Sequence, residues 1–181
     1  GTLSGFKPTD CLQDGGTQIG GVPNGDHFTP PGYIRNWVLT KGPELVIVDA
    51  GWSNIFTVTE TGLYTVHTLI YDPATLNLGV VEFGVTTGFD VNSLLIQGGG
   101  GICASLDVTG TSILVDNPDA GSLTSMDASV CLTDGEATLT AMVNDAPYVP
   151  AGYSVVYVLT EGPGLTIVNA GGEPSFTVTQ P

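Results

Sequence analysis

Short hydrophobic runs recur along the whole chain and predict β-strands. Leu45–Val48 and Phe56–Thr59 are rich in β-branched and aromatic residues and are bounded by Gly, Pro, Asn or Asp, which is the usual pattern of a strand. Leu63–Tyr71 is a longer run of the same kind. By the same criterion we expect further strands at Thr17–Val22, Tyr33–Thr40, Val80–Val85, Ile102–Val108 and Ser112–Val115.

One segment has a different pattern. Asp90–Gln97 predicts a short helical turn, with Asp90 as its N-terminal cap and Gly98 directly after it. Elsewhere the 26 Gly and 12 Pro residues argue against a helical bundle. Short strands at roughly ten-residue spacing over about 100 to 120 residues instead predict an all-β protein, built as an immunoglobulin-like (Ig-like) β-sandwich.

The sequence also repeats itself with a period of 120 residues. Gly1–Thr61 aligns with Gly121–Pro181 without a gap, and 24 of the 61 aligned positions are identical. VLTKGPELVIVDAG, for example, returns as VLTEGPGLTIVNAG. We therefore predict tandem repeats: residues 1–117 form one complete Ig-like repeat, and residues 118–181 form the first half of a second repeat that is incomplete in this chain. Half a sandwich should not be a closed domain by itself, because it leaves an apolar face and unpaired edge backbone in water.

The charge balance excludes several classes of partner. The chain has 3 Lys and Arg residues against 18 Asp and Glu residues, for a formal net charge of -15. Nucleic acid is excluded because binding phosphates requires basic groups. Membrane insertion is not expected either, because no apolar run is long enough to cross a bilayer. Two interpretations of the acidity stay open: a solvated surface that keeps the protein from associating, or binding of divalent cations.

The residue types that catalysis needs are scarce, and we predict no catalytic site. His27 aligns with Pro147 in the second copy, and His67 stands in the middle of a predicted strand. The serines lack the sequence context of an activated nucleophile, and the carboxylates show no obvious pair. These features argue against an enzyme.

A calcium site is one interpretation of the junction between the two copies. Asp116, Asn117 and Asp119 offer oxygen ligands there, and linkers between β-domains can share Ca²⁺. A solvated Asx-Pro turn explains the same residues. Asp14 and Asp134 lie in matching turns and are interpreted as turn formers. We expect that no cofactor is required, and Ca²⁺ is the single candidate.

The three cysteines have no metal-ligand spacing. Cys11 lies near the start of the complete repeat and Cys103 near its last strands, which a sandwich would bring together. We therefore predict a disulfide between Cys11 and Cys103, as an oxidising compartment would permit. Cys131 repeats Cys11, and its own partner would lie one period beyond Cys103, so it is expected to be unpaired in this chain.

Several segments resemble a known class of repeat. The segments are YTVHTLIYDP (Tyr64–Pro73), TTGFDVN (Thr86–Asn92), GGGGICASLDV (Gly98–Val108) and the PAGY and VLT motifs that follow Val149. They resemble the tandem Ig-like repeats of very large surface proteins of gliding and marine Bacteroidetes, which leave the cell by type IX secretion. The resemblance covers the full 120-residue unit, and it implies an extracellular repeat without enzymatic activity.

The expected function is that of a structural module in a secreted or cell-surface adhesin or filament. Such a module provides a stiff, protease-resistant stalk or fibre and takes part in contacts at the cell surface and between cells. Its partners would be neighbouring repeats and other copies in a filament. The alternative is a carbohydrate- or calcium-binding accessory module of a secreted enzyme. The second copy lacks both tryptophans, because Trp37 aligns with Tyr157 and Trp52 with Gly172, which argues against an aromatic sugar-binding platform.

Overall fold

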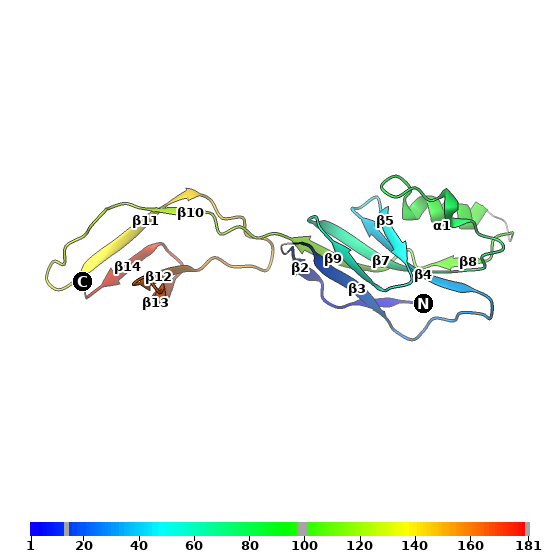
Figure 1. Cartoon of the computed structure of the whole chain (residues 1–181), viewed down its shortest axis with the longest axis horizontal. Coiled ribbons are helices and arrows are strands. Elements are labelled where there is room, and N and C mark those ends of the chain that lie inside the picture. The colour runs from blue at the N-terminus through cyan, green and yellow to red at the C-terminus, as the bar shows by residue number, and fades with distance from the viewer. Residues whose placement is uncertain (13–14, 98–100, 180–181) are drawn as a thin grey trace. The chain divides into compact units, whose positions relative to one another are not determined.

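The computed structural model describes residues 1–12, 15–97 and 101–179. The chain separates into two compact units, Gly1–Asn117 (unit 1) and Pro118–Pro181 (unit 2). Strands dominate both units, and the described residues contain a single α-helix (Figure 1). The predicted all-β class is confirmed.

Unit 1 contains two sheets. The smaller sheet has the strand order β1-β3-β6, and the larger has the order β2-β9-β7-β4-β5, with β8 also paired to β7. The elements of unit 1 are β1 (Leu3–Gly5), β2 (Thr9–Cys11), β3 (Thr17–Pro23), β4 (Ile34–Lys41), β5 (Val46–Gly51), β6 (Ile55–Val58), β7 (Gly62–Tyr71), the 3-10 helix η1 (Leu78–Val80), α1 (Gly88–Gln97), β8 (Ala104–Leu106) and β9 (Thr111–Asp116).

In chain order, β2 is the first strand of the larger sheet and β9 is the last, and these two strands lie side by side and run parallel. β2 pairs with β9 in parallel, with Cys11 opposite Asp116. Backbone hydrogen bonds extend this ladder at both ends: Leu114 N donates to Pro8 O at 2.9 Å, and Leu12 N donates to Asp116 O at 2.7 Å. All other strand pairs of unit 1 are antiparallel.

The two sheets pack against each other around one apolar core. Ile19, Phe56 and Val58 come from the smaller sheet, and Trp37, Leu39, Tyr64, Val66, Ile113 and Val115 come from the larger. A second core lies on the opposite face of the larger sheet, where η1 and α1 pack on Val38, Ile47, Leu69 and Tyr71. Because both faces of β4 and β7 are covered, residues 37–40 and 64–71 are buried without alternation.

The helix is longer at its start than predicted, and its cap is a different residue. Thr87 Oγ1 accepts a hydrogen bond from Asp90 N at 3.1 Å, and Asp90 Oδ2 accepts one from Thr87 N at 2.9 Å. This reciprocal pair is a capping box, with Thr87 as the cap and Asp90 three residues on. The same bonds from Thr87 lower the pKa of Asp90. Gly98, the expected residue after the helix, lies outside the described residues.

The strand predicted at Val80–Val85 is wrong. The segment begins with the end of η1 and continues as turns, and Val80, Phe83 and Val85 are all exposed. Its backbone bonds partly within the turns, where Thr86 N donates to Glu82 O at 2.8 Å, and partly to β5, where Gly84 N donates to Ile47 O at 2.8 Å. Apolar residues at alternate positions predicted a buried strand face that the fold does not form here. β8 is also shorter than the predicted Ile102–Val108.

Unit 2 has the strands β10 (Ser122–Ser125), β11 (Ala137–Asp145), β12 (Tyr157–Glu161), β13 (Thr166–Gly171) and β14 (Ser175–Val178). They form a β10-β11-β14 sheet and a separate β12-β13 hairpin. Every one of these pairings matches a pairing of unit 1 at a shift of 120 residues. The hairpins β4-β5 and β12-β13 even share a register shift, at Leu39/Thr40 and at Leu159/Thr160.

The two units differ in what covers these hairpins. In unit 1, β4 lies between β5 and β7, whereas β12 in the described part of unit 2 pairs with β13 alone. Ile47 is 3% exposed, and the aligned Ile167 is 68% exposed. Val38 and Val158 differ in the same direction, with 8% and 47% exposure. The elements that bury the outer face in unit 1 have no counterpart among the described residues of unit 2.

Candidate functional site

The structure does not form the predicted disulfide between Cys11 and Cys103. Cys11 lies opposite Asp116, at the end of the sheet where β7 begins with Gly62. Cys103 lies at the other end of β7, where its carbonyl oxygen accepts a hydrogen bond from Asp72 N at 2.8 Å. At about 3.3 Å per residue, the ten residues of β7 place the two cysteines roughly 30 Å apart. A disulfide needs Cα atoms within about 7 Å, so the expectation that the sandwich brings these two cysteines together is wrong.

Cys103 contacts a tyrosine from a distant part of the chain. Cys103 is exposed, and a hydrogen bond with its side chain raises the pKa of Tyr33. Cys131 is exposed in unit 2. All three cysteines lie in the described ranges, and none is joined to another.

The predicted calcium ligands lie on both sides of the boundary between the units. Asp116 Oδ1 accepts a hydrogen bond from Asn117 N at 3.0 Å, and Asp119 Oδ1 accepts one from Gly121 N at 2.8 Å. The bond from Gly121 N, two residues after Asp119, is typical of an Asx turn. Within the described ranges no group of three or more His, Cys, Asp or Glu residues could hold a metal ion, and a calcium site at this junction stays a prediction. Of the two turn aspartates, Asp134 has a positive φ of 56°, and Asp14 lies outside the described residues.

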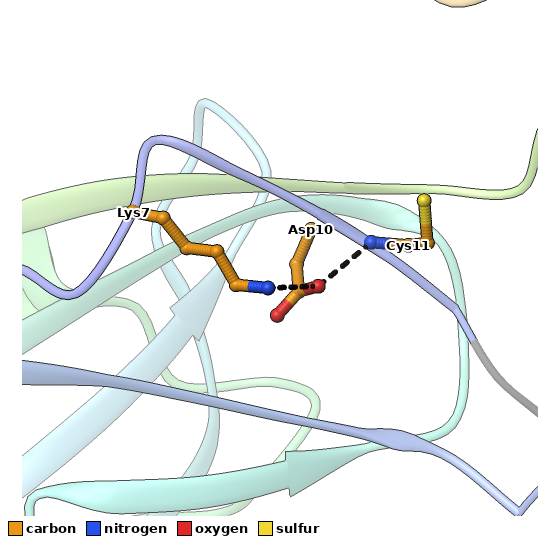
Figure 2. A network of polar contacts seen from close by, with 3 residues as sticks. All are labelled: Lys7, Asp10 and Cys11. Atoms are coloured by element: carbon orange, nitrogen blue, oxygen red, sulfur yellow. Dashed lines mark hydrogen bonds and ion pairs between the residues drawn. The ribbon is translucent and has the colours of Figure 1, made fainter.

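The three basic residues are all engaged within unit 1. Lys7 Nζ lies 2.6 Å from Asp10 Oδ1, and the same oxygen accepts a hydrogen bond from Cys11 N at 2.9 Å (Figure 2). This contact joins the segment before β2 to the strand itself.

The other two cations lie on β4 and contact aromatic rings. Lys41 Nζ lies 2.6 Å from Glu60 Oε2 and 5.4 Å from the centre of the Tyr64 ring. The ion pair raises the pKa of Lys41 and lowers that of Glu60. Arg35 lies over the ring of Trp37 at 5.4 Å, with Nη1 2.6 Å from His27 Nε2.

These positions predict resistance to trypsin in the native state. Arg35 and Lys41 lie in a central strand with partners on both sides, and Lys7 is followed by Pro8, whose fixed φ and missing N–H make it a poor fit for an extended protease site. We expect the native chain to stay intact, and the heat-unfolded chain to be cut after Lys41, as followed by mass spectrometry. Rapid cutting of the native chain after Arg35 would contradict this arrangement.

His67 is buried between β4 and β7 and is 2% exposed. Its Nδ1 lies 2.9 Å from Asp107 O, and its Nε2 lies 2.9 Å from Thr40 Oγ1. Because a carbonyl oxygen only accepts, Nδ1 carries the proton, and the neutral ring accepts from the Thr40 hydroxyl at Nε2. Burial lowers the pKa of His67. Thr40 is fully buried as well, and the contact between the two side chains joins β4 to β7.

The lowered pKa of His67 predicts that unit 1 loses stability in mild acid. Above the ordinary pKa of 6.5, His67 is neutral in both the folded and the unfolded chain, and stability is unaffected by its titration. Below 6.5 the unfolded chain binds the proton first, so the free energy of unfolding falls with pH, by at most about 1.4 kcal/mol per pH unit. Urea unfolding between pH 7.5 and 5 measures this slope. His67→Gln should show a shallower slope than the parent chain, and equal slopes would contradict the assignment.

A pocket with a volume of about 260 Å³ lies beside His67, on the outer face of the larger sheet. β4, β5 and β7 form its floor, and residues from η1 to α1 cover it. Its lining is largely apolar, with Asn36, Thr40 and His67 as polar side chains. Nothing in the sequence indicated this pocket, because its walls are formed by strands and a turn that are distant along the chain.

Comparison of the chain with protein-family models, with curated proteins and with solved structures gives no match. Among the helices in the described ranges, none is long and apolar enough to cross a membrane.

Proposed function

We propose that this chain is part of an extracellular structural protein, an adhesin or cell-surface filament built from tandem Ig-like modules. The observation that carries the proposal is the correspondence between the two units. Their strand pairings match at a shift of 120 residues, down to the same register shift in one hairpin. A chain that repeats one module in this way is suited to spanning distance.

The strand order of unit 1 supports an Ig-like sandwich. In the Ig nomenclature, β1-β3-β6 corresponds to strands A, B and E, and β9-β7-β4-β5 corresponds to G, F, C and C′. β2, which pairs with β9, then corresponds to a second segment of strand A that has crossed to the other sheet.

Three side-chain features agree with this correspondence. Trp37 lies buried on the strand equivalent to C, as the core tryptophan of Ig domains does. Tyr64 lies near the start of the F equivalent, and its hydroxyl donates to Glu60 O at 3.0 Å, which is the geometry of a tyrosine corner. Antibody domains join strands B and F by a disulfide two residues after that tyrosine, whereas apolar Ile19 and Val66 pack with Trp37 here.

The parallel pairing of β2 with β9 supports a role under tension. β2 follows the short strand β1 near the start of unit 1, and β9 is the last strand of that unit. A force that pulls the two ends apart therefore acts along both strands in opposite directions. All hydrogen bonds between Pro8 and Leu12 on one side and β9 on the other are then loaded together, in shear.

The charge supports a surface that does not associate without specificity. A net charge of -15 keeps copies from associating without specificity. The partners we propose are neighbouring repeats and other copies in a filament, with Ca²⁺ at the junction as a further element of stiffness.

Single-molecule stretching tests the proposal. With the full chain held by its two ends, unit 1 should unfold in one step that releases roughly 35–40 nm of chain, at about 0.35 nm per residue. In the control, one attachment moves from the C-terminus to Thr109 in the turn before β9, so that β2 and β9 are pulled from the same end and separate one bond at a time. The force should then be clearly lower. Equal forces in the two geometries would contradict a role as a load-carrying stalk.

A further inference from the structure

The pocket beside His67 has apolar walls on the sheet side and on the side of its cover. Val38, Ile47 and Leu69 line it from the larger sheet, and Val81 and Val91 line it from the segment between η1 and the end of α1. No Lys, Arg, Asp or Glu side chain is among the described lining residues. A charged molecule would therefore lose its hydration in this pocket without gaining a partner.

The polar side chains of the lining offer no hydrogen-bond acceptor to an occupant. Asn36 Oδ1 has no partner, but less than 1 Å² of its surface is accessible, so the open space of the pocket does not reach it. His67 Nε2 accepts a hydrogen bond from Thr40 Oγ1 at 2.9 Å, and these two side chains are 2% and 0% exposed. A molecule that brought a hydrogen-bond donor into the pocket would bury that donor without a side-chain partner, which is costly.

The same lining is a poor site for water. An internal water usually makes about three hydrogen bonds to polar groups, and apolar cavities stay dry and take up apolar molecules instead. The pocket has a volume of about 260 Å³, whereas a cavity of roughly 150 Å³ is known to hold benzene. One six-membered hydrocarbon ring therefore fits within it.

We propose that this pocket is a binding site for a small uncharged hydrocarbon, of the size of a single six-membered ring or a branched alkyl group. The occupant would lie over Val38 and Ile47 and beneath Val91. Phe83 also lines the pocket and is 56% exposed, so the pocket reaches the surface of unit 1 beside its ring. The proposal does not depend on the structural role, because the pocket lies on the face of the larger sheet away from the sandwich core.

Unit 2 carries the same floor without the cover. The five lining residues of the β4-β5 hairpin from Val38 onward are identical to the aligned residues of unit 2, which are Val158, Thr160, Leu165, Ile167 and Ala170. The segment from η1 to α1 has no counterpart among the described residues of unit 2. A hydrocarbon that needs an enclosed pocket should therefore bind unit 1 alone, and unit 2 is a control within the same chain.

Titration of the full chain with cyclohexane tests the proposal, with 1,4-dioxane as a match of the same size that carries two oxygens. The methyl resonances of Val38, Ile47 and Val91 should shift in a saturable way with cyclohexane. Those of Val158 and Ile167 should not shift in this way. Dioxane should bind at least about tenfold more weakly, because its oxygens lose their hydration in the pocket.

Two filled variants test the location. Ala50→Leu adds volume from the floor and Val91→Phe adds volume from the cover, and each should abolish the binding of cyclohexane. Ala170→Leu, the same substitution at the position aligned with Ala50, should leave binding as in the parent chain. The amide spectrum of each variant shows directly whether unit 1 is still folded.

The titration of the parent chain decides the proposal without any variant. Cyclohexane that causes no saturable shifts in unit 1, or that shifts the methyl groups of unit 2 equally, would overturn it. Dioxane that binds as tightly as cyclohexane would overturn the hydrocarbon class. Binding of cyclohexane to both folded, filled variants with the affinity of the parent would overturn the location.

Discussion

Replacing Trp37 with Ala should lower the free energy of unfolding of unit 1 by about 3–5 kcal/mol. Trp37 is 4% exposed and packs in the core between the two sheets, together with residues of β3, β6, β7 and β9. Truncation removes apolar contacts to both sheets and leaves a cavity that the strands cannot close without breaking their registers. Urea unfolding followed by circular dichroism measures the change.

The second tryptophan is a matched control. Trp52 is 75% exposed, so Trp52→Ala should alter stability by no more than about 0.5 kcal/mol. Trp37→Tyr should cost only about 1–2 kcal/mol, because the aligned residue of unit 2 is Tyr157. A Trp37→Ala variant as stable as Trp52→Ala would show that the two sheets do not pack around this side chain.

Amide hydrogen exchange should separate the two copies of the same sequence by a factor of about 1000 or more. Val38-Leu39-Thr40 and Val158-Leu159-Thr160 are identical tripeptides, so their intrinsic exchange rates match closely. β4 has a strand on either side, whereas β12 in the described part of unit 2 pairs with β13 alone, and isolated hairpins are marginally stable. A difference of about 4 kcal/mol in opening free energy corresponds to that factor.

The comparison is internal to one sample, so pH, temperature and concentration cancel. Mass spectrometry of the full chain after exchange, or two-dimensional NMR, gives both rates. Equal protection in β4 and β12 would mean that unit 2 is as cooperatively closed as unit 1, and it would contradict the interpretation of unit 2 as a part of the module.

Much of the fold could be predicted from local pattern, because the longer strands of unit 1 contain β-branched runs. β3, β4 and β7 match their predicted ranges closely. β1 and β2 are three residues each, and so short a segment shows no periodicity. The strand predicted at Val80–Val85 is wrong for the opposite reason: its apolar residues alternate as in a strand, but the segment forms turns, and Val80, Phe83 and Val85 are exposed.

The sites were harder to predict, because they depend on which ends of distant strands meet. Placing Cys11 near the start of the repeat and Cys103 near its last strands did not reveal that the length of β7 separates them. The pocket beside His67 combines β4, β5, β7 and the segment around α1. Because these parts are distant along the chain, no single stretch of the sequence predicted the pocket.

The most direct measurement adds a second copy of residues 62–117 behind Pro181 and compares amide exchange in β12 with that in β4. If unit 2 is the same module as unit 1, the added segment supplies the counterparts of β7, α1 and β9. β12 should then become as protected as β4, and Ile167 should become buried as Ile47 is. A shuffled segment of the same composition should leave β12 unprotected. If the added segment exchanges freely and β12 does not change, the two units are not copies of one module, and the proposed tandem array is contradicted.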